Sequence, residues 1–253
     1  IPVAARAVDD RHHRSSPRSE ILQRHMSLRA LLWDLDGTLL DTEHLWLQAE
    51  TDVMAVHGYE WSASDQRHCL GGPIERVTRY MSECIADDTS TQLLAAQLLD
   101  AMEHHLRTQD HAWRPGAVAL IQQARAAQMG LALVTASHRR LLDALDVTLE
   151  HKLAQALGGE PPVFSVTVAG DEVHATKPDP TPYLEAALRL GVDITECVVI
   201  EDSPTGVRSG LASGALVIAV PHLNPIEPAP RCRIVTSLED VGLDTLRAWH
   251  ADS

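Results

Sequence analysis

The stretch Ala30-Leu31-Leu32-Trp33-Asp34-Leu35-Asp36-Gly37-Thr38-Leu39-Leu40-Asp41-Thr42 decides the fold, because an apolar run ends there at two closely spaced acids. The apolar residues before Asp34 are typical of a strand buried on both faces of a parallel sheet. Asp34 and Asp36 flank a single residue, and Gly37 permits a sharp turn directly after them. Ligands of open α/β sheets bind beyond the carboxyl ends of the strands, so both carboxylates are expected at a site of chemistry.

Two acids this close repel each other unless chemistry requires them together. Either a divalent cation holds both, or one is a nucleophile and the other carries a proton. The alternative is a surface turn, in which Asp and Gly are common. The longer pattern, Asp34-Leu35-Asp36-Gly37-Thr38-Leu39 with Asp41-Thr42-Glu43 after it, resembles the first motif of the haloacid dehalogenase superfamily. Phosphatases of that superfamily use the first Asp as nucleophile, and the resemblance implies three further motifs downstream.

Composition limits the classes of protein to consider. The chain has 253 residues, of which 45% are apolar, and this allows one large domain or a domain with an insertion. No apolar run approaches the ~18 residues that a membrane span needs. The net charge of −14 argues against a nucleic-acid partner, which would require a basic face. The four cysteines show no zinc or redox spacing, which favours reduced thiols in a cytoplasmic protein.

The chain divides into three parts on its local pattern. Residues 1–27 are rich in charge and Ser, which predicts a disordered extension, and Met26 is a candidate for the true start. Residues 44–112 read as successive helices without a strand candidate, which predicts an inserted helical unit. Residues 28–43 and 113–253 alternate strand and helix, which predicts a core with a parallel sheet. A helix is expected from His138 to about Leu145.

Polar residues follow two later strands, and a lysine lies in a stiffened loop. Thr135 follows an apolar strand, Lys177 lies between prolines in Ala-Thr-Lys-Pro-Asp-Pro, and the acids Glu201 and Asp202 end another strand. Taken singly, each has an ordinary alternative: a strand-end Thr, a solvated loop lysine, and surface acids. Together they occur in the order of the four superfamily motifs, which are here Asp34-x-Asp36, Thr135 in Val-Thr-Ala-Ser, Lys177-Pro178, and Glu201-Asp202-Ser203-x-x-Gly206.

On these four motifs the chain is identified as a member of the superfamily over about residues 28–225. The resemblance implies an α/β fold: a Rossmann-like core whose parallel strands have the order 5-4-1-2-3, with a helical cap inserted after the first motif. It also implies a Mg²⁺ ion held by Asp34, the Asp36 carbonyl and Asp202, with Glu201 supporting.

The same resemblance implies the roles of the remaining residues. Asp34 would attack phosphorus and form an aspartyl-phosphate, and Asp36 would protonate the leaving oxygen and then activate water. Thr135, Ala136 and Lys177 would bind the phosphoryl oxygens. Gly37 would let the backbone approach the phosphate. Gly71, in Leu70-Gly71-Gly72-Pro73 of the cap, is expected either to contact the substrate or to form a plain tight turn.

Several functions fit these roles. The cap entry looks like that of bacterial sugar-phosphate phosphatases, so a small phosphorylated metabolite is the expected partner of a monomer or weak homodimer. The alternatives are a β-phosphoglucomutase-like phosphomutase, a phosphoglycolate-type phosphatase, and a catalytically silent binding module. A phosphomutase needs a cap cation for its distal phosphate, but the aligned residue is Ile74 and the hinge histidine corresponds to Trp46. Arg76 nearby keeps the phosphomutase alternative open.

Overall fold

The computed structural model describes residues 27–69, 73–85 and 89–253, apart from the side chains of residues 146–148. The predicted disordered extension, residues 1–27, lies outside the described residues except for Ser27, and so does the candidate start at Met26. The predicted substrate contact of Gly71 lies outside them too.

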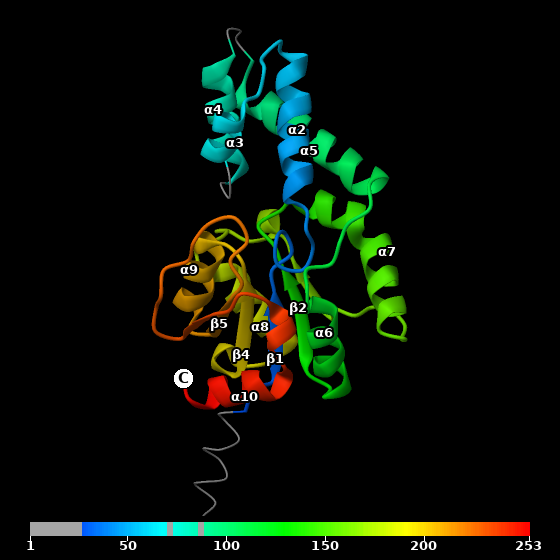
Figure 1. The fold of residues 1–253 in the computed structure, drawn as a ribbon, viewed down its shortest axis with the longest axis vertical. Coiled ribbons are helices and arrows are strands. Elements are labelled where there is room, and N and C mark those ends of the chain that lie inside the picture. Colours follow the sequence, from blue (N-terminus) through cyan, green and yellow to red (C-terminus); the bar gives the residue numbers. More distant parts are fainter. Residues whose placement is uncertain (1–26, 70–72, 86–88) are drawn as a thin grey trace, which may run out of the picture.

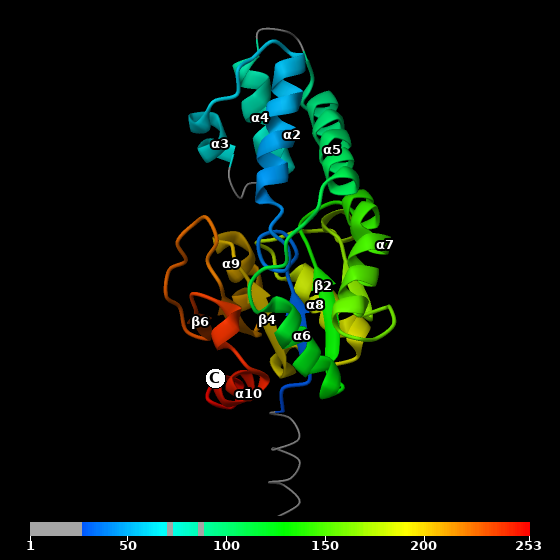
Figure 2. The same ribbon diagram turned by 45° about the vertical axis from the view of Figure 1, so that its right-hand side comes forward.

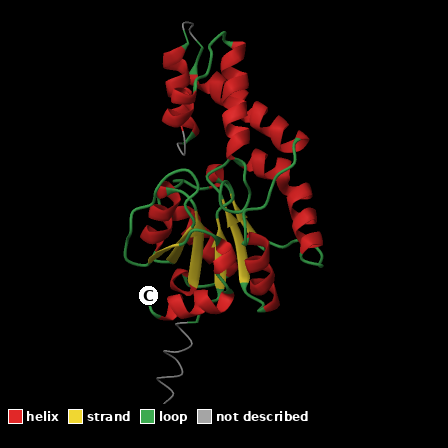
Figure 3. Cartoon of the chain, in the orientation of Figure 1, coloured by secondary structure: helices red, strands yellow, loops and turns green. Residues whose placement is uncertain are grey.

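A six-stranded parallel sheet forms the centre of the molecule (Figures 1 and 3). Its strands are β1 Ala30–Trp33, β2 Gly130–Val134, β3 Val166–Val168, β4 Cys197–Glu201, β5 Leu216–Ala219 and β6 Cys232–Ile234. They lie in the order β3-β2-β1-β4-β5-β6, so the predicted order 5-4-1-2-3 is confirmed, and β6 extends it beyond β5. Trp33 at the end of β1 pairs with Leu133 and Ile200 on the neighbouring strands, so the residues that follow these strands meet at one edge.

Helices cover both faces of this sheet. They are α6 Ala117–Ala126, α7 Arg139–Ala156, α8 Thr181–Leu190, α9 Pro204–Ser213 and α10 Leu243–Ala251, with 3₁₀ turns at Gly170–Glu172, Ile194–Glu196 and Leu238–Asp240. Successive strand residues point to opposite faces, so Leu31 and Trp33 pack in the core that contains residues of α6 and α7. Ala30 and Leu32 pack with residues of α8 and α9 instead. All four residues of β1 are fully buried, as their continuous apolar character predicts.

A helical cap is inserted between β1 and β2, above the carboxyl ends of the strands (Figures 1 and 2). Its helices are α2 Glu43–Val56, α3 Ala63–Cys69, α4 Ile74–Cys84 and α5 Thr91–Thr108. The two chain segments that join cap and core pair with each other, since Leu40 forms an antiparallel bridge with Trp113. The backbone N–H of Asp41 donates to Ala112 O at 2.9 Å, and that of Arg114 to Leu39 O at 2.9 Å. The connection is therefore a paired double strand.

One helix is longer than the sequence predicts. The helix expected to end near Leu145 continues as α7 to Ala156, so the predicted boundary is wrong. The extension is explained by burial, because Leu149 and Leu153 lie one and two turns further on and are 5% and 0% exposed. The start of α7 also contacts the cap, where Arg140 forms ion pairs with Asp100 and Glu103 of α5.

No helix in the described ranges is long and apolar enough to cross a lipid bilayer.

Candidate active site

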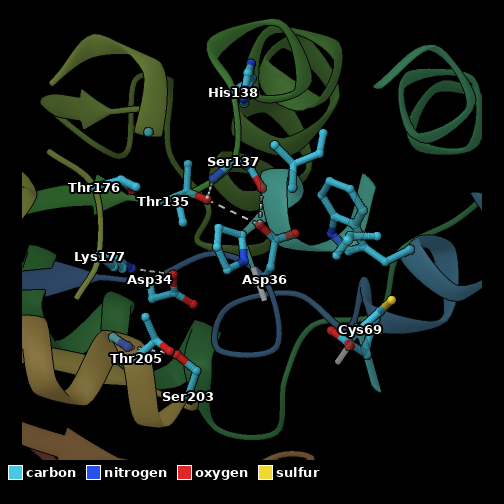
Figure 4. A pocket seen from close by; sticks show the side chains of 18 of the residues that line it. Asp34, Asp36, Cys69, Thr135, Ser137, His138, Thr176, Lys177, Ser203 and Thr205 are labelled. Atoms are coloured by element: carbon cyan, nitrogen blue, oxygen red, sulfur yellow. Dashed lines mark hydrogen bonds and ion pairs between the residues drawn. The ribbon is translucent and has the colours of Figure 1, made fainter. Parts of the chain in front are cut away.

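A cavity of about 360 Å³ lies between the carboxyl edge of the sheet and the cap. The structure brings most of the predicted site residues together in its wall: Asp34, Asp36, Thr135, Ala136, Lys177 and Asp202. Two other predicted residues lie just behind the wall, since Glu201 contacts Lys177 and Gly37 packs against Asp202. Figure 4 shows Lys177 and Asp34 on one side of Asp36 and Cys69, from cap helix α3, on the other. The cavity is therefore large enough for a small ligand that reaches from core to cap.

The ammonium group of Lys177 is buried at the centre of the core side. Its Nζ donates to Asp34 Oδ1 at 2.6 Å, to Glu201 Oε1 at 2.7 Å and to Val134 O at 2.9 Å. All three of its protons therefore have protein acceptors. Burial lowers the pKa of Lys177, but the charges of Asp34 and Glu201 and their hydrogen bonds raise it above its ordinary value. The side chain is accordingly a permanent cation at the sheet edge.

Lys177 binds one carboxylate oxygen of Asp34 and leaves the other oxygen open toward the cavity. In the described part of the chain, Asp34 Oδ2 accepts no hydrogen bond, whereas Oδ1 is fixed by Lys177. Burial and the charge of Glu201 raise the pKa of Asp34 to about 7, although Lys177 opposes the shift. Asp34 is thus an oriented carboxyl group with one oxygen available for attack.

The acids around Asp34 form a cluster that fits a divalent cation. Carboxylate oxygens of Asp34, Glu201 and Asp202 lie within 4.8 Å of one another. Burial and the charges of Asp34 and Glu201 raise the pKa of Asp202 well above its ordinary value, so one lysine does not balance the three acids. A hard cation with oxygen ligands would relieve this repulsion.

Glu201 is a less suitable ligand than the other two acids, because both of its oxygens are already occupied. Oε1 accepts from Lys177 and from the Tyr183 hydroxyl at 2.8 Å. Oε2 accepts from the Asp202 and Ser203 backbone N–H groups and from Ser203 Oγ, at 3.0–3.2 Å. Gly206 packs so closely against this carboxylate that a Cβ there would overlap it. Glu201 therefore anchors Lys177, and Asp34 and Asp202 remain for a metal.

Gly37 also contributes to the acidic cluster, because it packs against the Asp202 carboxylate. Its φ of +83° lies in the left-handed region, and a Cβ would overlap the Asp202 carboxylate. The turn that follows Asp36 can therefore close only with glycine at this position, and it brings Thr38 Oγ1 within 3.2 Å of Asp202 Oδ1.

Three hydroxyl groups hold the carboxylate of Asp36 beside the cavity. Thr42 Oγ1 donates to Oδ1 at 2.7 Å. Ser137 Oγ and Thr135 Oγ1 donate to Oδ2 at 2.7 and 3.2 Å (Figure 4). Thr135 was predicted as a phosphate ligand, but its hydroxyl is oriented by Asp36. Thr42 and Ser137 were not predicted as site residues, although both lie inside the quoted motifs. Their position beside a motif residue was the only signal in the sequence.

The cap wall of the cavity is apolar and acidic. Trp46, Leu47, Ile74, Val77, Leu98 and Leu99 contribute its apolar part. Glu43, Glu50 and Glu75 contribute carboxyl groups. Glu50 is only 5% exposed, and its Oε2 accepts from Trp61 Nε1 at 3.0 Å. Burial raises the pKa of Glu50 to about 7, although the Trp61 hydrogen bond opposes the shift.

The raised pKa of Glu50 predicts a pH-dependent effect on stability. The unfolded chain releases this proton near pH 4.5 and the folded chain near pH 7, so stability falls as pH rises through this window. Replacing Glu50 with Gln, which keeps an acceptor for Trp61, should raise the free energy of unfolding at pH 8 by about 1–3 kcal/mol. At pH 4.5 and below, the two proteins should be nearly equal. Urea unfolding at both pH values measures this difference.

The exposed Glu60 provides the control, because Glu60→Gln should change stability little at either pH. A Glu50→Gln variant that is no more stable than the wild type at pH 8 would contradict the assignment of a costly buried charge.

Comparisons with known proteins agree with this geometry. The family described as haloacid dehalogenase-like hydrolase matches residues 31–220. Protein CbbY of Rhodobacter capsulatus is 32% identical over 209 residues, which are 78% of this chain and 86% of that protein. Hexitol phosphatase A of Escherichia coli is 32% identical over 220 residues, 80% of this chain and 90% of that protein. The crystal structure of CbbY from Rhodobacter sphaeroides with phosphate superimposes with a TM-score of 0.73 at 28% identity, covering 87% of this chain and 99% of that chain.

The matched range contains all four motifs and exceeds half of the chain. The expectation from the sequence is thereby confirmed: the chain belongs to the haloacid dehalogenase-like hydrolase family and is an enzyme of its phosphoric monoester hydrolase class.

Proposed function

We propose that the protein is a Mg²⁺-dependent phosphatase that hydrolyses a small sugar phosphate through a phosphorylated Asp34. One observation carries the proposal: Lys177 fixes one oxygen of Asp34 while the other faces a cavity whose opposite wall is the cap. The names of two relatives favour the substrate class, since they are a hexitol phosphatase and the fructose-1-phosphate phosphatase YqaB of Escherichia coli. YqaB is 28% identical over 186 residues, 73% of this chain and 92% of that protein.

In the first step, Asp34 Oδ2 attacks phosphorus and the ester bond to the leaving oxygen breaks. Asp36, held by three hydroxyl groups beside the cavity, gives its proton to that oxygen. In the second step, Asp36 takes a proton from water, the water oxygen attacks phosphorus, and the bond to Asp34 breaks. Phosphate leaves, and both acids return to their starting state.

The residues fit a magnesium ion. Asp34, Asp202 and the Asp36 backbone carbonyl would hold it, and Glu201 would support the site by fixing Lys177. When bound, the ion supplies positive charge that offsets the charge on the phosphoryl oxygens and on the acids. Lys177 has all three protons on protein oxygens, so its first role is to orient Asp34. The Ser137 backbone N–H donates to Thr135 Oγ1, which leaves that of Ala136 as the candidate phosphate donor.

The cap wall of the cavity favours hydrolysis over phosphomutase activity. Ile74 and Trp46, which replace the expected phosphomutase residues, both line the cavity. Arg76, the residue that kept the phosphomutase alternative open, donates instead to the carbonyls of His68 and Cys69 at 3.3 and 3.1 Å. Neither Ile74 nor Trp46 therefore offers a distal phosphate a counter-charge, and Arg76 is not part of the cavity lining.

We also propose how the chain divides into a catalytic core and a cap. Residues 44–112 act as the cap, and residues 28–43 and 113–253 act as the catalytic core. We expect a cytoplasmic monomer or weak homodimer without a nucleic-acid or membrane partner, in keeping with the net charge of −14.

Replacement of Asp34 by Asn tests the nucleophile. Activity should fall by about 10³-fold or more, because the amide cannot form the covalent bond. The pKa of Asp34 is raised by burial and by Glu201, so its charge costs stability above the ordinary pKa, and the variant should be as stable as the wild type or more stable at pH 8 without metal. Phosphate release from p-nitrophenyl phosphate and urea unfolding measure the two effects.

Asp143→Asn is a matched control, because Asp143 is 61% exposed and lies outside the cavity lining. It should keep full activity. An Asp34→Asn enzyme with more than a few per cent of wild-type activity would refute the covalent mechanism.

Removal of the metal tests the cation site. EDTA should abolish activity, excess Mg²⁺ should restore it, and Ca²⁺ should inhibit, because its longer bonds and higher coordination number would draw the Asp34 oxygens out of line. Mg²⁺ should also raise the unfolding temperature of the wild type but not of Asp202→Asn. Undiminished activity in excess chelator would rule out the metal.

A further inference from the structure

The side chains that can carry positive charge in this cavity lie on its core side. Among the described residues that line it, only Lys177 and His138 can carry positive charge, and both belong to the core. Lys177 is committed to Asp34 and Glu201. His138 lies 3.8 Å from Asp171 Oδ2, and Figure 4 places it on the far side of Ser137 from Asp36. The cap wall itself therefore contributes neither cation.

The cap wall would repel a second anionic group. Its described ionisable side chains are the three carboxyl groups of Glu43, Glu50 and Glu75, apart from the thiol of Cys69. Ile74 and Val77 add apolar surface to the same wall. Such a wall offers a second anionic group no counter-charge, and its ionised carboxyl groups would repel that group.

Glu50 gives the same wall one attractive contact. It is 95% buried, and within the described chain its Oε1 has no hydrogen-bond partner, whereas Oε2 is bound to Trp61 Nε1. Glu50 lines the cavity, which leaves this oxygen open to a hydrogen bond from the substrate. A hydroxyl group on the substrate would satisfy it, and because burial raises the pKa of Glu50 to about 7, the carboxyl can also donate to that hydroxyl.

We propose that the substrate is a monophosphate ester whose other end is uncharged and hydroxylated, with Glu50 binding a hydroxyl group and Ile74 denying a distal anion its counter-charge. This inference rests on the proposed phosphatase function and narrows it. It separates this chain from the Rhodobacter sphaeroides CbbY variant whose crystal structure contains xylulose-1,5-bisphosphate. It also disfavours phosphoglycolate, whose carboxylate would face the acidic wall.

Matched pairs of compounds test the inference on the wild-type enzyme with Mg²⁺. Fructose 1-phosphate is compared with fructose 1,6-bisphosphate, and sorbitol 6-phosphate with 6-phosphogluconate. Each pair changes one distal group to an anion. We expect kcat/KM to be about 100-fold higher for the better uncharged monophosphate than for its anionic counterpart.

The outcomes separate this inference from the proposed function. Failure to hydrolyse every compound, including p-nitrophenyl phosphate, would overturn the phosphatase function itself. Hydrolysis of the bisphosphate or of 6-phosphogluconate as fast as the uncharged partner would overturn only the inference. So would hydrolysis of p-nitrophenyl phosphate with none of the hydroxylated monophosphates accepted.

Two variants test which residues discriminate between uncharged and anionic substrates. Ile74→Arg should shift the kcat/KM ratio toward the bisphosphate by about tenfold or more, since it supplies the missing cation. Leu93→Arg is the control, because it adds the same charge at a side chain that is 51% exposed and outside the cavity lining, and the ratio should not change. Glu50→Leu should raise KM for the hydroxylated monophosphates more than for p-nitrophenyl phosphate. An unchanged ratio in a folded Ile74→Arg enzyme, or equal KM effects in Glu50→Leu, would contradict the assignment.

Discussion

The ammonium group of Lys177 joins the carboxyl ends of the three central strands, and the site depends on this junction. Its acceptors are Asp34 after β1, the Val134 carbonyl at the end of β2 and Glu201 at the end of β4. A buried charge is tolerated only when it is paired and hydrogen-bonded. The parallel pairing of β2, β1 and β4 brings all three acceptors to one point. The sheet topology therefore specifies the position of Asp34.

The junction also explains why so many acids can share one small site. Both carboxylate oxygens of Glu201 accept hydrogen bonds, from Lys177, from Tyr183 and from the turn that follows Glu201. Its charge is therefore stabilised by the protein itself. Asp34 and Asp202 retain the surplus charge, which burial makes unfavourable and a divalent cation would relieve. The carboxylate of Asp36 has a different environment, because hydroxyl groups and not a cation bind it. Two carboxyl groups of one motif thus acquire different environments, as a nucleophile and a proton carrier require.

Much of this arrangement could be predicted from the sequence, because its signals are local. Apolar runs that end in polar residues identify strand ends, and parallel pairing then brings Asp34, Thr135 and Asp202 to one edge. The contacts of Lys177 could not be predicted, because its partners lie 143 and 24 residues away along the chain. The role of Gly206 was hidden for the same reason, since it depends on the Glu201 side chain packed against it. The length of α7 was missed because burial of Leu149 and Leu153, a tertiary contact, maintains the helix.

Trapping the phosphorylated enzyme tests most directly the claim that this junction presents Asp34 as the nucleophile. The enzyme would be mixed with a ³²P-labelled sugar monophosphate and Mg²⁺, quenched in acid within milliseconds, reduced with borohydride and digested for peptide mass spectrometry. Borohydride reduces an aspartyl-phosphate to homoserine, so the account predicts homoserine at position 34 and label that is lost on treatment with hydroxylamine. An unmodified Asp34 in an enzyme that is turning over, or label on another residue, would contradict it.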